Sequence, residues 1–103
     1  MKLSKLLEDI EIIEIVGNTE IEINEIIIDS KLVVKNSLFV CLSGEKFDGH
    51  DYVGQAERYG ASAVVVERKV QTNLTQIIVK NTFAILKKCV MIIMIGDEIE
   101  KNI

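Results

Sequence analysis

The stretch SLFVCLSGEKFDGHDYVGQAERYGASAVVVE, residues 37–67, decides the fold of this 103-residue chain. Short apolar runs at 37–42 and 62–67 are flanked by turn-forming residues, which is typical of strands buried on both faces. The segment between them has apolar residues at helical spacing and ends at Gly60, a common residue just after a helix. This strand, helix, strand order predicts a βαβ unit with parallel strands and a right-handed crossover.

Elements on either side extend this unit. They are a short amphipathic helix at 2–10, a strand at 21–28, a strand at 76–80 and a helix at 81–90. The last three residues of the 21–28 strand are all isoleucine, which predicts burial on both faces. Asn81 or Thr82 would cap the last helix. The sequence therefore predicts an α/β fold, with a small mixed or parallel sheet flanked by helices in a single domain.

Composition excludes several classes of function. The net charge is −4 and no long basic stretch occurs, so attraction to nucleic acid or to an anionic membrane surface is not expected. The N-terminus has recurring acidic residues instead of a signal sequence, and the most apolar segment, 89–96, is far too short to span a bilayer. Cys41 and Cys89 lie in apolar runs, as buried free thiols do, which favours a cytoplasmic location.

The segment GEKFDGHD, residues 44–51, has the outline of a phosphate-binding loop, with two glycines separated by four residues. His50 and Asp51 stand where such a loop needs a lysine and a hydroxyl, so we do not expect it to bind ATP. Two interpretations remain, and both can hold. The loop could contact a substrate, or its glycines could simply allow a tight turn while Asp48 caps the following helix.

His50 is the only histidine and lies between two aspartates, which raises a metal-binding or acid-base role. We favour the alternative, in which it makes local hydrogen bonds in the first turn of a helix. A triad of Ser30, His50 and an aspartate is disfavoured because no nucleophile-elbow pattern surrounds Ser30. Cys41 is expected to be a buried, unreactive thiol. No catalytic or metal-binding residue is therefore predicted on this chain.

A set of short motifs occurs in order between residues 29 and 67. They are Asp29-Ser30-Lys31, Leu38-Phe39-Val40, Gly44, Asp48-Gly49-His50-Asp51-Tyr52, Gln55-Ala56, Gly60-Ala61 and Ala63 to Glu67. In this order and spacing they resemble the N-terminal domain of Mur ligases, most closely the MurE type, which are UDP-N-acetylmuramoyl-dipeptide amino-acid ligases of peptidoglycan synthesis. The sequence departs from the family pattern in two places. Lys31 replaces an arginine, and the turn that is Pro-Gly-Asp in the family is Lys35-Asn36-Ser37 here. Asn36 can stand for the glycine because asparagine also accepts a left-handed backbone conformation.

The resemblance implies a non-catalytic domain that binds the uridine diphosphate end of UDP-N-acetylmuramoyl-L-Ala-D-Glu. Ile28 and Ser30 would contact the nucleotide end, and Glu45, Lys46 and Phe47 would form the loop opposite. Lys46 could bring positive charge to the diphosphate, and Phe47 could offer a flat apolar face to the uracil ring. Both loops follow strands, where ligands of open α/β sheets usually bind.

The C-terminus departs most from the family. Where the resemblance implies an ATP loop, Gly96 is followed by an acidic segment, 97–100. We therefore expect a substrate-recognition domain at 1–82 and a tail at 83–103, with ATP and Mg²⁺ belonging to a family domain that this chain lacks, and no activity from the chain alone. The alternative is a remnant or interaction module that keeps the fold without binding a ligand. An apolar tail also tends to pair with another copy, so self-association is a further expectation.

Overall fold

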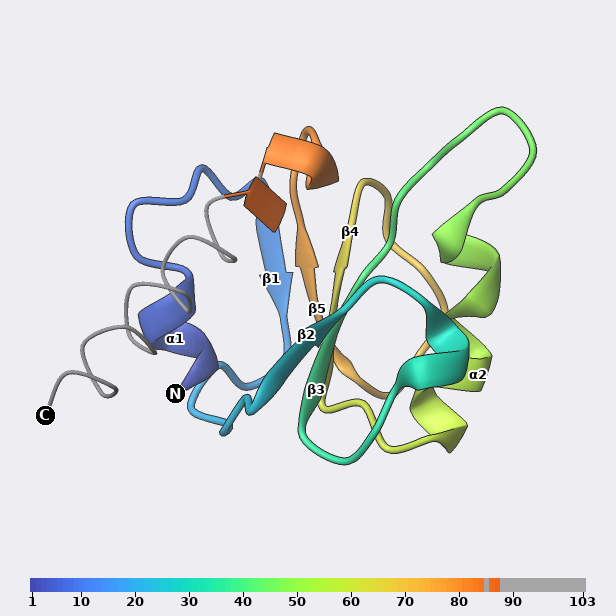
Figure 1. Cartoon of the computed structure of the whole chain (residues 1–103). Helices are drawn as coiled ribbons and strands as arrows, with labels where there is room; N and C mark the ends of the chain where they lie inside the picture. The colour runs from blue at the N-terminus through green and yellow to red at the C-terminus, as the bar shows by residue number, and fades with distance from the viewer. Residues whose placement is uncertain (85, 88–103) are drawn as a thin grey trace, which may run out of the picture.

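A computed structural model describes residues 1–84, 86 and 87 of the chain. Five strands form one sheet in the order β1-β5-β4-β3-β2 (Figure 1). They are β1 Glu14–Val16, β2 Glu25–Ile27, β3 Ser37–Val40, β4 Ala63–Val66 and β5 Thr75–Ile78. Strands β2 to β5 pair in parallel, and β1 pairs antiparallel with β5. The prediction of a small mixed sheet with parallel central strands is confirmed.

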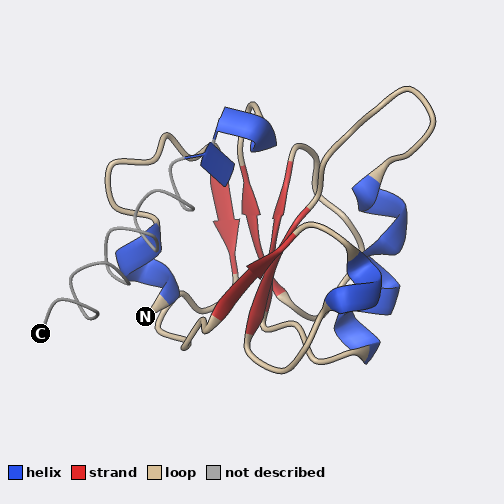
Figure 2. Ribbon diagram, in the orientation of Figure 1, coloured by secondary structure: helices blue, strands red, loops and turns tan. Residues whose placement is uncertain are grey.

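Helices cover both faces of this sheet (Figure 2). The α-helices are α1 Leu3–Leu6 and α2 Val53–Arg58, and two 3-10 helices are η1 Ser30–Leu32 and η2 Gly49–Tyr52. Figure 1 shows α1 on one side of the sheet and α2, with η1 beside it, on the other. In the described part of the chain, no helix is long and apolar enough to cross a bilayer.

Two apolar clusters explain why β3 and β4 are continuous apolar runs. Alternate side chains of a strand point to opposite faces. Leu38 and Val40 therefore join the cluster that contains the α1 leucines, whereas Phe39 packs in the cluster that contains Val53 and Ala56 of α2. Every residue of β3 and β4 is buried, which confirms the predicted βαβ unit with two buried parallel strands.

The prediction for 21–28 is partly wrong. The strand is short, covering Glu25–Ile27, and lies at the edge of the sheet, where it pairs only with β3 among the residues the structure describes. Ile26 and Ile27 are half-buried, each packed against a different cluster, and Ile28 is 46% exposed. Ile28 lies beyond the end of β2, so the run of three isoleucines did not guarantee burial of its last residue.

Two turns at the amino ends of β3 and β4 contain residues with positive φ. Asn36 has φ 66° and Gly60 has φ 101°, and the Asn36 amide donates to the Gly60 carbonyl at 3.2 Å. Asparagine tolerates this conformation better than most residues with a side chain. The prediction that Asn36 takes the place of a glycine is confirmed.

The last helix begins after Asn81, and its residues 82–84 are helical. The Asn81 Oδ1 accepts hydrogen bonds from the amides of Phe83, at 2.9 Å, and Ala84, at 3.4 Å. Asn81 is thus the cap, one of the two residues predicted for this role. Cys89 and the rest of the tail at 88–103 lie outside the described residues.

Candidate functional site

A surface pocket of about 350 Å³ lies at the carboxyl ends of β2 and β3. Its lining comprises Ile28, Asp29, Lys31, Leu42 and Phe47. Because β2 and β3 are parallel, the loops that follow them meet at the same edge of the sheet, where ligands of open α/β sheets usually bind. Two of the five residues predicted to contact substrate therefore line one pocket, although they are 19 positions apart in the sequence.

Phe47 gives this pocket a flat aromatic side. The residue is 45% exposed, and its ring stacks on the ring of Tyr52, with centroids 5.0 Å apart and planes at 16°. Tyr52 ends η2, so the stack fixes the orientation of Phe47 relative to α2. With half-exposed Ile28 and half-buried Leu42, the pocket offers an apolar surface to a planar ring.

Ser30 is not among the lining residues. Its side chain is turned inward, the residue is only 2% exposed, and its hydroxyl donates to the Gln55 Oε1 at 2.6 Å. This bond fastens η1 to α2 and so holds Asp29 and Lys31, the neighbours of Ser30 that do line the pocket. From sequence, Gln55 is part of a family motif without an assigned role, because its pairing with Ser30 depends on two elements that only the fold brings together.

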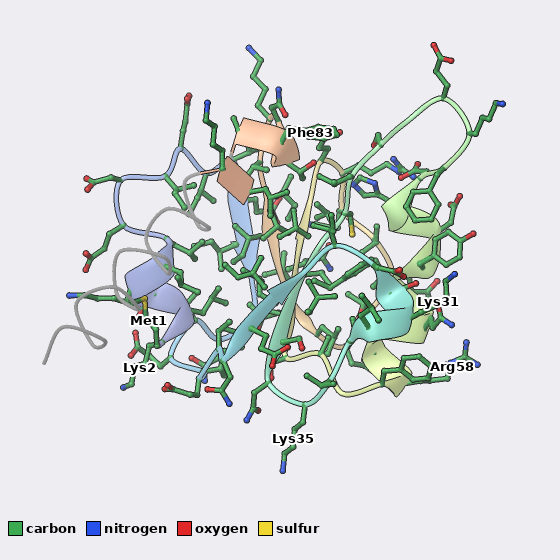
Figure 3. The ribbon with its side chains drawn as sticks, viewed as in Figure 1. Met1, Lys2, Lys31, Lys35, Arg58 and Phe83 are labelled. Carbon is green, nitrogen blue, oxygen red and sulfur yellow. The ribbon has the colours of Figure 1, made fainter. Side chains whose placement is uncertain are left out.

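Glu45 and Lys46 lie at the tip of their loop. The Gly44 amide donates to the Phe47 carbonyl at 2.7 Å, which closes a tight turn around them. Both side chains are exposed, and neither lines the pocket. Lys31 is the basic residue that does line it; from sequence it was noted only as the replacement for an arginine. Figure 3 shows Lys31 beside α2, on the opposite side of the molecule from Met1.

Asp48 caps η2, as predicted. Its Oδ1 accepts from the His50 amide at 2.9 Å and lies 2.6 Å from the His50 Nδ1, while Arg68 donates to Oδ2 at 2.9 Å. The backbone hydrogen bond from His50 and the hydrogen bond from Arg68 lower the pKa of Asp48 well below its usual range. Asp48 therefore remains ionised and joins the loop to Arg68, the second residue after β4.

The His50 side chain is buried and hydrogen-bonded within the fold. Its side chain is 1% exposed, and its Nε2 accepts from the Glu67 amide at 2.8 Å. Because Nε2 is an acceptor, the ring proton is on Nδ1, facing Asp48. Both ring nitrogens are thus used inside the fold, which confirms the interpretation of His50 as a residue that makes local hydrogen bonds. The contact with Glu67 was not predicted, since 17 residues separate the pair.

The other candidates for chemistry are also accounted for. Ser30 bonds to Gln55 and His50 bonds to Asp48 and Glu67, so the structure does not bring Ser30 and His50 together as a triad. Burial raises the pKa of the Cys41 thiol to about 12, which keeps it protonated. In the described part of the chain, no group of three or more His, Cys, Asp or Glu side chains is placed to hold a metal ion.

Backbone amides at the two ends of the loop at 44–51 make hydrogen bonds within the fold. Besides the Gly44 bond, the Gly49 amide donates to the Leu42 carbonyl at 2.8 Å, and the His50 amide donates to Asp48. A phosphate-binding loop needs successive free amides directed at the anion. The arrangement of these hydrogen bonds is that of a turn followed by a helix cap.

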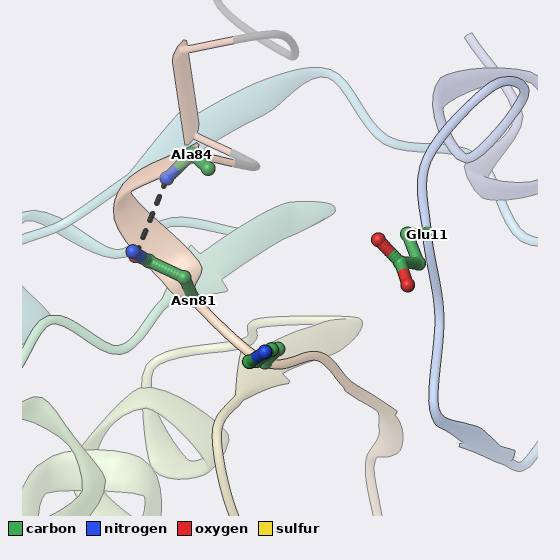
Figure 4. A pocket seen from close by; sticks show the side chains of 4 residues that line it. Glu11, Asn81 and Ala84 are labelled. Atoms are coloured by element: carbon green, nitrogen blue, oxygen red, sulfur yellow. Dashed lines mark hydrogen bonds between the residues drawn. The ribbon is translucent and has the colours of Figure 1, made fainter.

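A second pocket, of about 340 Å³, lies beyond the carboxyl end of β5 (Figure 4). Glu11, Lys80, Asn81 and Ala84 line it, and the hydrogen bond that caps the last helix crosses its edge. It has one acidic and one basic side chain and contains none of the predicted substrate residues. The pocket at β2 and β3 is therefore the better candidate site.

The carboxylate of Asp48 predicts a loss of stability in acid. Its pKa is lower in the folded chain than the ordinary 3.8. Its contribution to the free energy of unfolding is therefore complete above that ordinary value and is lost as the pH falls toward the lower, folded value. Urea unfolding between about pH 5 and about pH 2 should show this decline. In Asp48→Asn, which keeps an acceptor but does not titrate, the decline should be smaller, and equal slopes would contradict the prediction.

The comparisons with known proteins agree with this fold. A family model described as "Mur ligase family, catalytic domain" matches residues 22–94. The UDP-N-acetylmuramoyl-L-alanyl-D-glutamate–2,6-diaminopimelate ligase of Alkaliphilus metalliredigens is 43% identical over 84 residues, which are 80% of this chain and 17% of the relative. The ligase of the same name from Bacillus licheniformis is 42% identical over 83 residues, again 80% of this chain and 17% of the relative.

A solved structure of a Mur ligase has a similar fold over most of this chain. The crystal structure of MurF from Acinetobacter baumannii superposes with a TM-score of 0.73 and 26% identity, covering 84% of this chain and 19% of MurF. The chain thus spans less than a fifth of the length of each of these proteins. Because the family model covers most of the chain and relatives above 40% identity cover four fifths of it, the chain belongs to the Mur ligase family, as a MurE-like N-terminal domain.

Proposed function

We propose that this domain binds the uridine diphosphate end of UDP-N-acetylmuramoyl-L-Ala-D-Glu for a ligase of peptidoglycan-precursor synthesis. One observation carries the proposal. Ile28 and Phe47, which the family resemblance assigns to the nucleotide end and to the loop opposite, line one pocket at the carboxyl edge of the sheet. The names of the diaminopimelate ligases, which begin with UDP-N-acetylmuramoyl-L-alanyl-D-glutamate, support the same substrate class.

The size and the lining of the pocket fit a small planar ligand. Its volume of about 350 Å³ is at the lower end of the range for small-molecule sites. Phe47 presents a ring of fixed orientation, on which a uracil could stack, while Ile28 and Leu42 exclude water from the ring. In this proposal Ser30 acts through its bond to Gln55, which holds η1 against α2, and Glu45 and Lys46 form the rim of the loop.

The test is a titration of the 103-residue chain with UDP-N-acetylmuramoyl-L-Ala-D-Glu, followed by the chemical shifts of its backbone amides. We expect the largest shifts at residues 28–31 and 42–47, because these segments surround the pocket. Residues of α1, on the opposite side of the sheet, serve as the internal control and should not shift. If residues 28–31 and 45–47 stay unmoved at millimolar ligand, the chain keeps the fold without binding, which is the alternative raised by its sequence.

A further inference from the structure

We propose that Lys31, and not Lys46, supplies the positive charge that holds the diphosphate of the nucleotide. The inference rests on the proposed function, because it takes the pocket at β2 and β3 to be the nucleotide site. It adds a ligand-binding residue that the family resemblance did not assign to this role. It also replaces the expectation, drawn from sequence, that Lys46 would meet the phosphates.

The position of Lys31 favours this residue over Lys46 as the contact for the diphosphate. It lines the pocket together with Ile28 and Phe47, whereas Lys46 is at the exposed tip of the loop and does not. Lys31 is the second residue of η1, which is anchored by the bond from Ser30 to Gln55. An ammonium on an anchored backbone loses less freedom on binding than one at a loop tip, so more of its attraction to phosphate remains as affinity.

The charge of Lys31 is also available. No ion pair joins its ammonium group to another of the residues that the structure describes. By comparison, Lys2 and Lys69 contact Glu20 and Glu14 at 3.3 and 3.0 Å. Arg68 is likewise paired, because its guanidinium contacts Asp48 at 2.9 Å. A phosphate in the pocket could therefore contact the Lys31 ammonium group without an existing ion pair having to break.

Asp29 makes the pocket selective for a nucleotide over a simple anion. Its Oδ1 accepts from the Lys31 amide at 2.9 Å, which fixes the carboxylate at the pocket wall. The opposite charges of Asp29 and Lys31 leave the lining without a net positive charge, so free pyrophosphate should bind weakly. A nucleoside diphosphate should bind more tightly, because its base contacts the apolar wall. Its ribose hydroxyls can also donate hydrogen bonds to the Asp29 carboxylate.

The experiment compares uridine, UMP, UDP and inorganic pyrophosphate as ligands of the full 103-residue chain, by amide shifts or calorimetry. The wild-type chain should bind UDP about tenfold more tightly than uridine, since a charge-assisted contact is gained. In Lys31→Met the affinity for UDP should fall about tenfold while that for uridine is unchanged. Lys31→Arg should restore the preference for UDP. Raising the salt concentration should weaken UDP binding in the wild type and leave Lys31→Met nearly unaffected.

Lys46→Met tests the alternative assignment, and Lys35→Met is the matched control. Lys46→Met and Lys35→Met each remove one exposed lysine, and Figure 3 shows Lys35 at a different end of the molecule from Lys31. Both should keep the wild-type ratio of UDP to uridine affinity. If Lys31→Met keeps that ratio, or if Lys46→Met loses it, the assignment of Lys31 is overturned while the proposed function stands. If the wild-type chain binds neither UDP nor uridine, the proposed function itself fails.

Discussion

Replacing Phe39 with alanine should lower the free energy of unfolding by about 3–5 kcal/mol, the largest effect that we expect from a single core substitution. Phe39 is fully buried in β3 and is the largest of the fully buried side chains among the described residues. It packs in the cluster formed with α2, so truncation would leave a cavity between sheet and helix. Urea unfolding measures the change directly, through a lower midpoint at constant slope.

Phe47 is the matched control for this prediction. Phe47→Ala removes the same atoms from a side chain that is 45% exposed, so its cost in stability should be less than about 1 kcal/mol. The same substitution should weaken the binding of UDP, because the pocket loses its aromatic side. A Phe39→Ala chain that unfolds no more easily than Phe47→Ala would contradict the core described here.

Replacing Gly49 with alanine should also destabilise the chain strongly, by about 3 kcal/mol. A Cβ atom at this position would lie 2.9 Å from the Cys41 Cα and 2.9 Å from the Leu42 amide nitrogen. These are backbone atoms at the end of β3, and they cannot move aside as a flexible side chain can. The turn that connects β3 to η2 would have to open, and thermal or urea unfolding would record the loss.

Gly54 provides the control for Gly49. It lies in α2, and a Cβ atom added there would meet nothing within 4 Å. Gly54→Ala should therefore raise the free energy of unfolding by about 0.5–1 kcal/mol, because alanine favours the helix. If Gly49→Ala lowers the free energy of unfolding and Gly54→Ala raises it, steric crowding is distinguished from the effect of backbone entropy. Equal effects would show that the approach of Gly49 to β3 does not limit stability.

The family motif at 44–51 illustrates what this loop does. From sequence, its two glycines suggested a phosphate loop that lacks the lysine. In the structure only Gly49 is required by close packing, since a Cβ at Gly44 would meet no atom closer than 3.5 Å. Asp48 and His50 use their polar atoms to join the loop to the end of β4. The motif therefore shapes a wall of the pocket, which Phe47 lines.

The sequence predicted those parts of the fold that depend on neighbouring residues. Continuous apolar runs identified β3 and β4, the spacing between them identified α2, and Asn36, Asp48 and Asn81 were recognised as turn and cap residues. Each of these signals acts over a few positions, because a helix turn, a strand period and a cap are local structures. The same reasoning failed for Ile28, which follows the end of β2 and lines a surface pocket, because a local pattern cannot reveal what packs over a side chain.

The candidate site also divides into residues that the sequence identified and residues that only the structure revealed. The family motifs alone pointed to Ile28 and Phe47, and both line the pocket, but the motifs also pointed to Lys46 and left Lys31 without a role. Whether a side chain reaches a pocket depends on how the loops after β2 and β3 pack against α2, including the bond from Ser30 to Gln55. The sequence by itself thus determined the elements of this domain, whereas only the tertiary structure decided which side chains meet, because contacts between distant segments depend on strand order and packing.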